Sequence, residues 1–171
     1  MTPETLDALF PAILAWVQTQ ENLGNEQGRP LNEWEREQAI EAGVIHADEI
    51  RIREASRPLG EEPLVLDGIE APKELSEIFT GMFACPPFRY SLLQPPKGGP
   101  LIFGIATALN FQRMCRHIYQ FEQLGAYEIF LRTYLEEVLQ YGSLEAPMCK
   151  EATTFWAIPR STSADSQQNP S

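Results

Sequence analysis

The chain has 171 residues, of which 43% are hydrophobic and 22% charged, the composition of an ordinary globular protein. Its 24 acidic residues outnumber the 13 basic ones, and the formal net charge is −11. Such a balance argues against the clustered positive charge on which binding to nucleic acid or to anionic lipid depends. There is also no run of about 18 apolar residues, the length that indicates a membrane-spanning helix. We therefore expect neither nucleic acid nor a membrane among its partners.

The acidic residues are concentrated in the first part of the chain. Residues 1–75 carry 16 acidic and 6 basic side chains, whereas residues 76–171 carry 8 and 7. An acidic surface usually serves solubility. The alternative is that it forms a surface for a basic partner, which would make the chain an acidic interaction or inhibitor protein.

The cysteines and the N-terminus indicate a cellular compartment. Cys85, Cys115 and Cys149 are an odd number of widely spaced thiols, which is typical of a reducing environment. The first residues lack the basic side chains that open a signal peptide. We expect a cytoplasmic protein.

Hydrophobic periodicity predicts six helices and a small sheet. Apolar residues at helical spacing predict helices over 2–17, 33–42, 72–85, 105–124 and 126–141, and a last helix that begins near 145–147 and ends at about 156. Residues 22–31 are predicted to be a polar loop. Alternating residues predict strands over 48–53 and 88–93, and 64–66 is predicted to be a short buried segment. From Leu101 onward the chain is predicted to be helical.

These elements predict one domain over residues 1–157, with an N-terminal helix and loop over 1–31 and a core over 32–157. Residues 158–171 are predicted to be a disordered tail, because little in them can join a core. The expected fold class is α+β and mainly helical, with a small sheet packed against a helical C-terminal half.

One helical segment carries a candidate chemical site. Only two histidines exist in the chain, and one of them, His117, lies in the predicted helix 105–124. Positions 113 and 117 are four residues apart and share one face of that helix. This is the spacing of the zinc motif H-E-x-x-H, in which two histidines bind the metal and the glutamate activates water.

Three segments around this position resemble a group of small, uncharacterised bacterial proteins similar to zinc metallopeptidases. The group reads L-x-H-E-x-R-H-V-x-Q-Y-E, then F-L-x-x-Y-L, then A-P-L-E-x-E-A. This chain reads F-Q-R-M-C-R-H-I-Y-Q-F-E over 111–122, F-L-R-T-Y-L over 130–135, and A-P-M-C-K-E-A over 146–152. The resemblance covers roughly residues 33–156 and implies a minimal zincin-like fold.

The resemblance also implies that the catalytic site is degenerate. Arg113 and Met114 replace the first histidine and the glutamate, whereas His117 is retained. The third zinc ligand of the family corresponds to Glu151 or, in the other possible match, to Cys149. A catalytic zinc needs three protein ligands, and an arginine keeps its positive charge in proteins. Since methionine cannot act as a base either, we expect no catalytic residue and no zinc.

Two hypotheses describe what takes the place of the metal. The first is that Arg113 pairs with Glu151, because a buried guanidinium needs a carboxylate; the alternative keeps Arg113 on a solvated helix face. The second is a relocated metal site, although ligands two apart on a helix do not face each other. The potential ligands of that relocated site are Cys115, His117, Cys149 and Glu151. The residues that could surround the degenerate site are Cys115, Arg116, Gln120 and Cys149.

The sequence therefore favours a protein that is not an enzyme, a metallopeptidase-like scaffold that acts by binding a protein or peptide. A second copy of the chain is an open possibility for the partner. The alternative is a hydrolase with a relocated metal or different chemistry in the same cleft.

Overall fold

The computed structural model describes residues 1–55, 65–81, 89–94, 101–105, 108–142 and 144–159. This part of the chain contains six α-helices: α1 (Pro3–Gln27), α2 (Glu33–Glu41), α3 (Lys73–Gly81), α4 (Ala108–Leu124), α5 (Tyr127–Tyr141) and α6 (Pro147–Ala157). None of the described helices is long and apolar enough to cross a membrane.

The strands form two small antiparallel sheets. The larger has the order β1-β2-β5-β6, built from β1 (Arg29–Pro30), β2 (Arg51–Ala55), β5 (Arg89–Gln94) and β6 (Leu101–Ile105). The smaller is a hairpin of β3 (Val65–Leu66) and β4 (Ile69–Glu70). The predicted mainly helical α+β class is confirmed.

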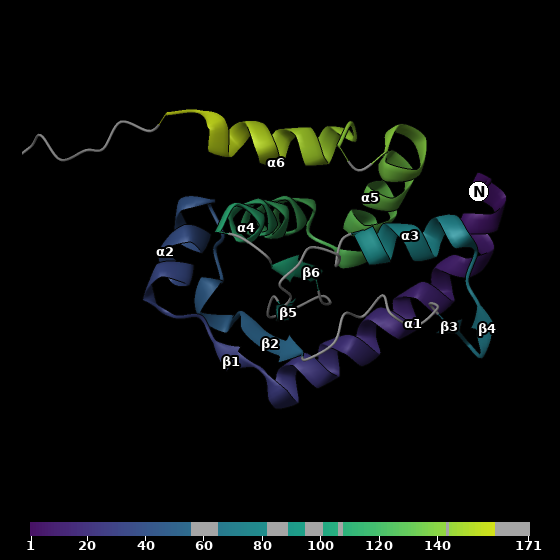
Figure 1. Ribbon diagram of the computed structural model, residues 1–171, viewed down its shortest axis with the longest axis horizontal. Coiled ribbons are helices and arrows are strands. Elements are labelled where there is room, and N and C mark those ends of the chain that lie inside the picture. Colours follow the sequence, from purple (N-terminus) through teal and green to yellow (C-terminus); the bar gives the residue numbers. More distant parts are fainter. Residues whose placement is uncertain (56–64, 82–88, 95–100, 106–107, 143, 160–171) are drawn as a thin grey trace, which may run out of the picture.

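The helices cover both sides of the larger sheet. In Figure 1 the strands lie between α1 on one side and α4 on the other, and α6 lies outside α4. Contacts agree with this picture, since α1 packs on β2 and β5, while α4 packs on β6 and α6. The helix that carries His117 therefore lies between the sheet and α6.

Helix α1 is longer than predicted. The expected loop over 22–31 is wrong for residues 22–27, because the helix continues to Gln27 with Pro11 inside it. Leu6, Ile13 and Val17 are buried, so packing on the sheet holds the N-terminal two thirds of the helix in place. A helix that is held in place by packing tolerates a polar last turn, because each residue of low helix propensity lowers the stability of the helix by less than about 1 kcal/mol.

A second correction concerns the segment that follows Leu101. Residues 101–105 form strand β6 rather than a helix, with Leu101 opposite Leu93 and Ile105 opposite Arg89. Periodicity does not separate a short apolar run of strand from one of helix. The partner strand decides, because its free backbone groups satisfy those of the new strand.

Smaller differences affect the other predicted elements. The strand predicted over 48–53 lies at 51–55, after a 3-10 turn η1 (Ala47–Glu49). In the predicted buried segment 64–66, Leu66 is buried and Val65 is exposed. The predicted stop at Cys85 and the tail beyond 159 lie outside the described residues.

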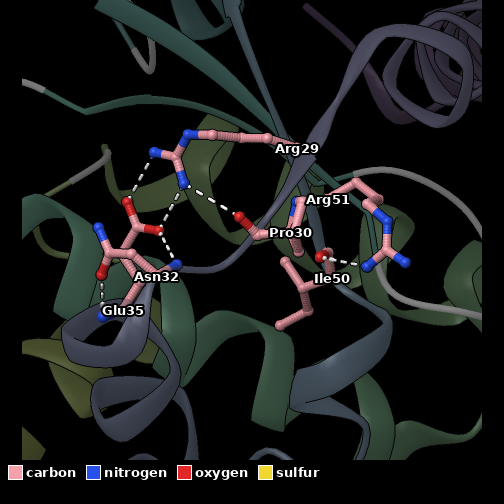
Figure 2. Close-up of polar contacts among 6 residues, drawn as sticks. All are labelled: Arg29, Pro30, Asn32, Glu35, Ile50 and Arg51. Carbon is pink, nitrogen blue, oxygen red and sulfur yellow. Dashed lines mark hydrogen bonds and ion pairs between the residues drawn. The ribbon is translucent and has the colours of Figure 1, made fainter.

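The junction between β1 and α2 is held by polar side chains (Figure 2). Asn32 is the N-cap of α2 and accepts a hydrogen bond from the Glu35 N–H, at 2.9 Å, while Glu35 Oε2 accepts one from the Asn32 N–H, at 2.8 Å. Arg29 donates to both carboxylate oxygens of Glu35, at 2.8 and 2.9 Å. This capping box starts the helix and attaches the edge strand to it.

One connected core includes residues from α1 to α6. Helix α4 contributes five residues that are all buried: Phe111, Met114, Cys115, Ile118 and Phe121. These positions repeat at three- and four-residue spacing, and they direct one face of α4 inward. The polar side chains on its remaining surface meet α2 and α6.

Candidate functional site

A polar network lies where α4 meets α6. Arg116 of α4 donates from Nε and Nη2 to Oε1 of Glu151, at 2.9 and 2.7 Å. Its Nη1 donates to the carbonyl of Ala42, at the end of α2, at 2.8 Å. The guanidinium carbon also lies 3.8 Å from the centre of the Tyr119 ring and 3.9 Å from that of Phe155. Arg116 thus joins three helices.

The expectation that Arg113 pairs with Glu151 is wrong, because Arg116 makes that ion pair. Positions 113 and 116 point in similar directions, but 116 lies one turn farther along the helix. Glu151 lies opposite this later turn. The register between α4 and α6 therefore selects one of two arginines that the sequence pattern cannot distinguish.

Gln120 connects the ion pair to the buried histidine. Its amide nitrogen donates to Glu151 Oε2, at 2.6 Å, and to the Met148 carbonyl, at 3.0 Å. The amide oxygen of Gln120 lies 2.7 Å from Nδ1 of His117. Because that oxygen can only accept, His117 carries its proton on Nδ1 and leaves Nε2 as an acceptor.

His117 is held in a neutral state by its surroundings. Burial lowers its pKa to about 4, and the charge of Arg113 acts in the same direction, whereas Gln120 and Glu151 act against it. The ring centre of Tyr134 lies 5.6 Å away in an edge contact, and that of Phe130 lies 6.4 Å away. The imidazole therefore sits between an aromatic wall from α5 and the polar network.

Arg113 stands apart from this network. Its Nε is buried and has no hydrogen-bond partner, and within the described ranges no carboxylate forms an ion pair with it. The side chain as a whole keeps part of its surface exposed. The charge of Arg113 acts to lower the pKa of Cys149 as well as that of His117.

The two described cysteines are free thiols in an inactive state. Cys115 lies in the core, and burial and the Glu35 charge raise its pKa strongly. Burial also raises the pKa of Cys149, although the hydrogen-bonded Tyr134 and Arg113 oppose this. A reactive cysteine needs a lowered pKa, so neither thiol is set up as a nucleophile.

The described residues do not fit a catalytic zinc. Nε2 of His117 is an acceptor, as in a metal ligand, but Glu151 is bound by Arg116 and Gln120. Met114, at the position of the family's glutamate, is 1% exposed and packs in the core. Among the described residues no group of three or more His, Cys, Asp or Glu side chains could hold a metal ion.

Two acidic residues have roles that sequence reasoning missed. Glu122 of α4 accepts hydrogen bonds from the backbone of Ile45 and His46, at 2.7 and 3.1 Å. Glu137 of α5 accepts from the Met148 N–H at the start of α6, at 2.8 Å. Ala146 at the N-cap of α6 was a signal for the second contact, since alanine cannot cap a helix.

Comparison with known proteins adds no relative, because no protein family, curated protein or solved structure matches the chain. Functional inference therefore rests on the chemistry of the site.

Proposed function

We propose that the chain is a non-catalytic, metallopeptidase-like protein that acts by binding a protein or peptide partner. The observation that carries the proposal is the state of Glu151. Both of its carboxylate oxygens accept hydrogen bonds from protein side chains, those of Arg116 and Gln120. A metal would have to displace the charged Arg116 and the Gln120 amide to reach this carboxylate.

The neighbouring groups support the same conclusion. Met114 cannot accept a proton from water, and the positive charge of Arg113 disfavours a second positive charge at His117. These side chains argue against both requirements of zinc-dependent hydrolysis, a bound metal and a base that activates water. The free thiols of Cys115 and Cys149 support a reducing, cytoplasmic location as part of the proposal.

The strand order of the described sheet supports a peptide as the partner. In the described sheet β6 pairs with β5 along one side only, so an extended peptide can add to the open side. Backbone hydrogen bonds would supply affinity there without any reaction.

Metal content and peptidase activity test the proposal. The protein, purified without chelators or metal-affinity resin, should contain far less than one zinc per chain by mass spectrometry. It should also leave unstructured protein substrates intact with and without added zinc. Stoichiometric zinc together with hydrolysis that a chelator abolishes would overturn the proposal.

A further inference from the structure

Arg113 differs from the other arginines whose side chains are described. Each of the others bonds to oxygen atoms of the described chain: Arg29 to Glu35, Arg36 to Asp48, Arg51 to the Asp48 and Ile50 carbonyls, Arg116 to Glu151, and Arg132 to Asp7 and Glu136. Arg113 has no such oxygen within the described ranges, and its Nε is buried. A buried donor without a partner is rare in proteins and calls for an explanation.

The groups around Arg113 do not balance its charge. Burial favours the neutral forms of His117 and Cys149, the two groups on which the charge of Arg113 acts. The charge of Glu151 also acts on His117, but its carboxylate is bound by Arg116 and Gln120. Glu137, whose charge reaches Cys149, is committed to the Met148 N–H. Because a partly buried cation without a counter-ion is costly, this arrangement favours an anion that comes from outside the chain.

We infer that Arg113 binds a carboxylate of the peptide partner, either its C-terminus or an aspartate or glutamate side chain. The Nε of Arg113 is buried, but Nη1 and Nη2 are not, and their two parallel N–H groups match the two oxygens of a carboxylate. A single unpaired guanidinium balances one negative charge, which favours a carboxylate over a doubly charged phosphate. The inference rests on the proposed function in taking a peptide as the ligand, and it gives that ligand a required charge.

The Nε–H signal of Arg113 in the NMR spectrum of the whole protein gives a direct test. The probes are acetyl-trialanine with a free C-terminus, the same peptide as its amide, an amidated peptide with one central aspartate, and inorganic phosphate, all at millimolar concentration. At least one carboxylate probe should shift the Arg113 signal saturably, and the two carboxylate peptides distinguish the terminal from the side-chain source. No shift, an equal shift with the uncharged amide, or a shift with phosphate alone would overturn the inference.

Two variants complete the test. Arg113→Gln should lose the saturable response of the remaining site signals, whereas Arg36→Gln, which removes an exposed arginine paired with Asp48, should keep it. If Arg113→Gln does not fold, the Nε–H titration of the unaltered protein decides alone. The two hypotheses fail in different ways. A protein that contains no zinc, has no peptidase activity and binds neither carboxylate probe contradicts only the role of Arg113.

Discussion

Arg116 and Glu151 form the ion pair that joins α4 to α6, with Nη2 and Oε1 2.7 Å apart. The same guanidinium binds the end of α2 through the Ala42 carbonyl. One arginine thus holds together the three helices around the candidate site, and it takes up the carboxylate that the resemblance assigns to a metal.

Replacing Glu151 with glutamine should weaken the contact between α4 and α6. Arg116 is only 14% exposed and would lose its counter-charge, whereas Glu151 is 43% exposed, which reduces the cost. We expect the free energy of unfolding to fall by about 1–2 kcal/mol in urea denaturation. Glu145→Gln is the matched control, because its pair with Lys150 is more than half exposed on both sides and should contribute less than about 0.5 kcal/mol. Equal effects of the two substitutions would contradict the role given to Glu151.

His117 should make stability depend on pH in a defined window. The unfolded chain protonates this histidine near the ordinary histidine pKa of 6.5, whereas in the folded protein burial lowers the pKa to about 4. The unfolded state therefore binds the proton more readily in this window. The stability from a neutral His117 is complete above pH 6.5 and is lost as the pH falls toward 4, by about 3 kcal/mol in all.

Urea denaturation at pH 7, 5.5 and 4.5 would measure this dependence. His117→Asn should flatten it, because the asparagine amide can still donate to Gln120 but does not titrate in this range. His46→Gln removes the exposed histidine and should leave the dependence in place. If the free energy of unfolding of His117→Asn depends on pH as strongly as that of the unaltered protein, the effect belongs to another group.

Gly43 should resist substitution for two separable reasons. Its φ of +92° favours glycine, and an added Cβ would lie 2.9 Å from Cδ2 of Tyr119. We expect Gly43→Ala to lower the free energy of unfolding by about 2–3 kcal/mol, which combines backbone strain and overpacking. Gly125→Ala adds strain alone, since φ is +74° and nothing lies within 4 Å of the new Cβ. Its cost in the same denaturation assay should be clearly smaller.

Glu35→Ala should destabilise the N-terminal turn of α2. The change removes three hydrogen bonds, two from Arg29 and one from the Asn32 N–H (Figure 2). We expect a loss of about 2 kcal/mol and faster hydrogen exchange in the first turn of α2. Glu33→Ala removes an exposed acid from the same turn and should cost about 0.5 kcal/mol through the helix dipole. Unchanged exchange in Glu35→Ala would contradict the capping role.

Local sequence signals predicted those elements that strong periodicity and end signals specify. Gly142 and Pro147 mark the end of α5 and the start of α6, and both helices lie where the pattern placed them. The pattern failed for Leu101–Ile105 and for the last turns of α1. Whether a short apolar run becomes strand, or a polar run stays helical, depends on neighbours that are distant in the chain.

The sequence by itself determined the chemistry of two side chains, because Arg113 keeps its positive charge and Met114 cannot act as a base wherever they lie. Only the tertiary structure decided which arginine meets Glu151, through the register of α6 on α4. It also decided that Gln120 links that pair to His117 and that the Arg113 Nε is buried without a partner. The hydrogen bonds between α4 and α6 join residues 28 to 35 positions apart, and no local pattern specifies their alignment.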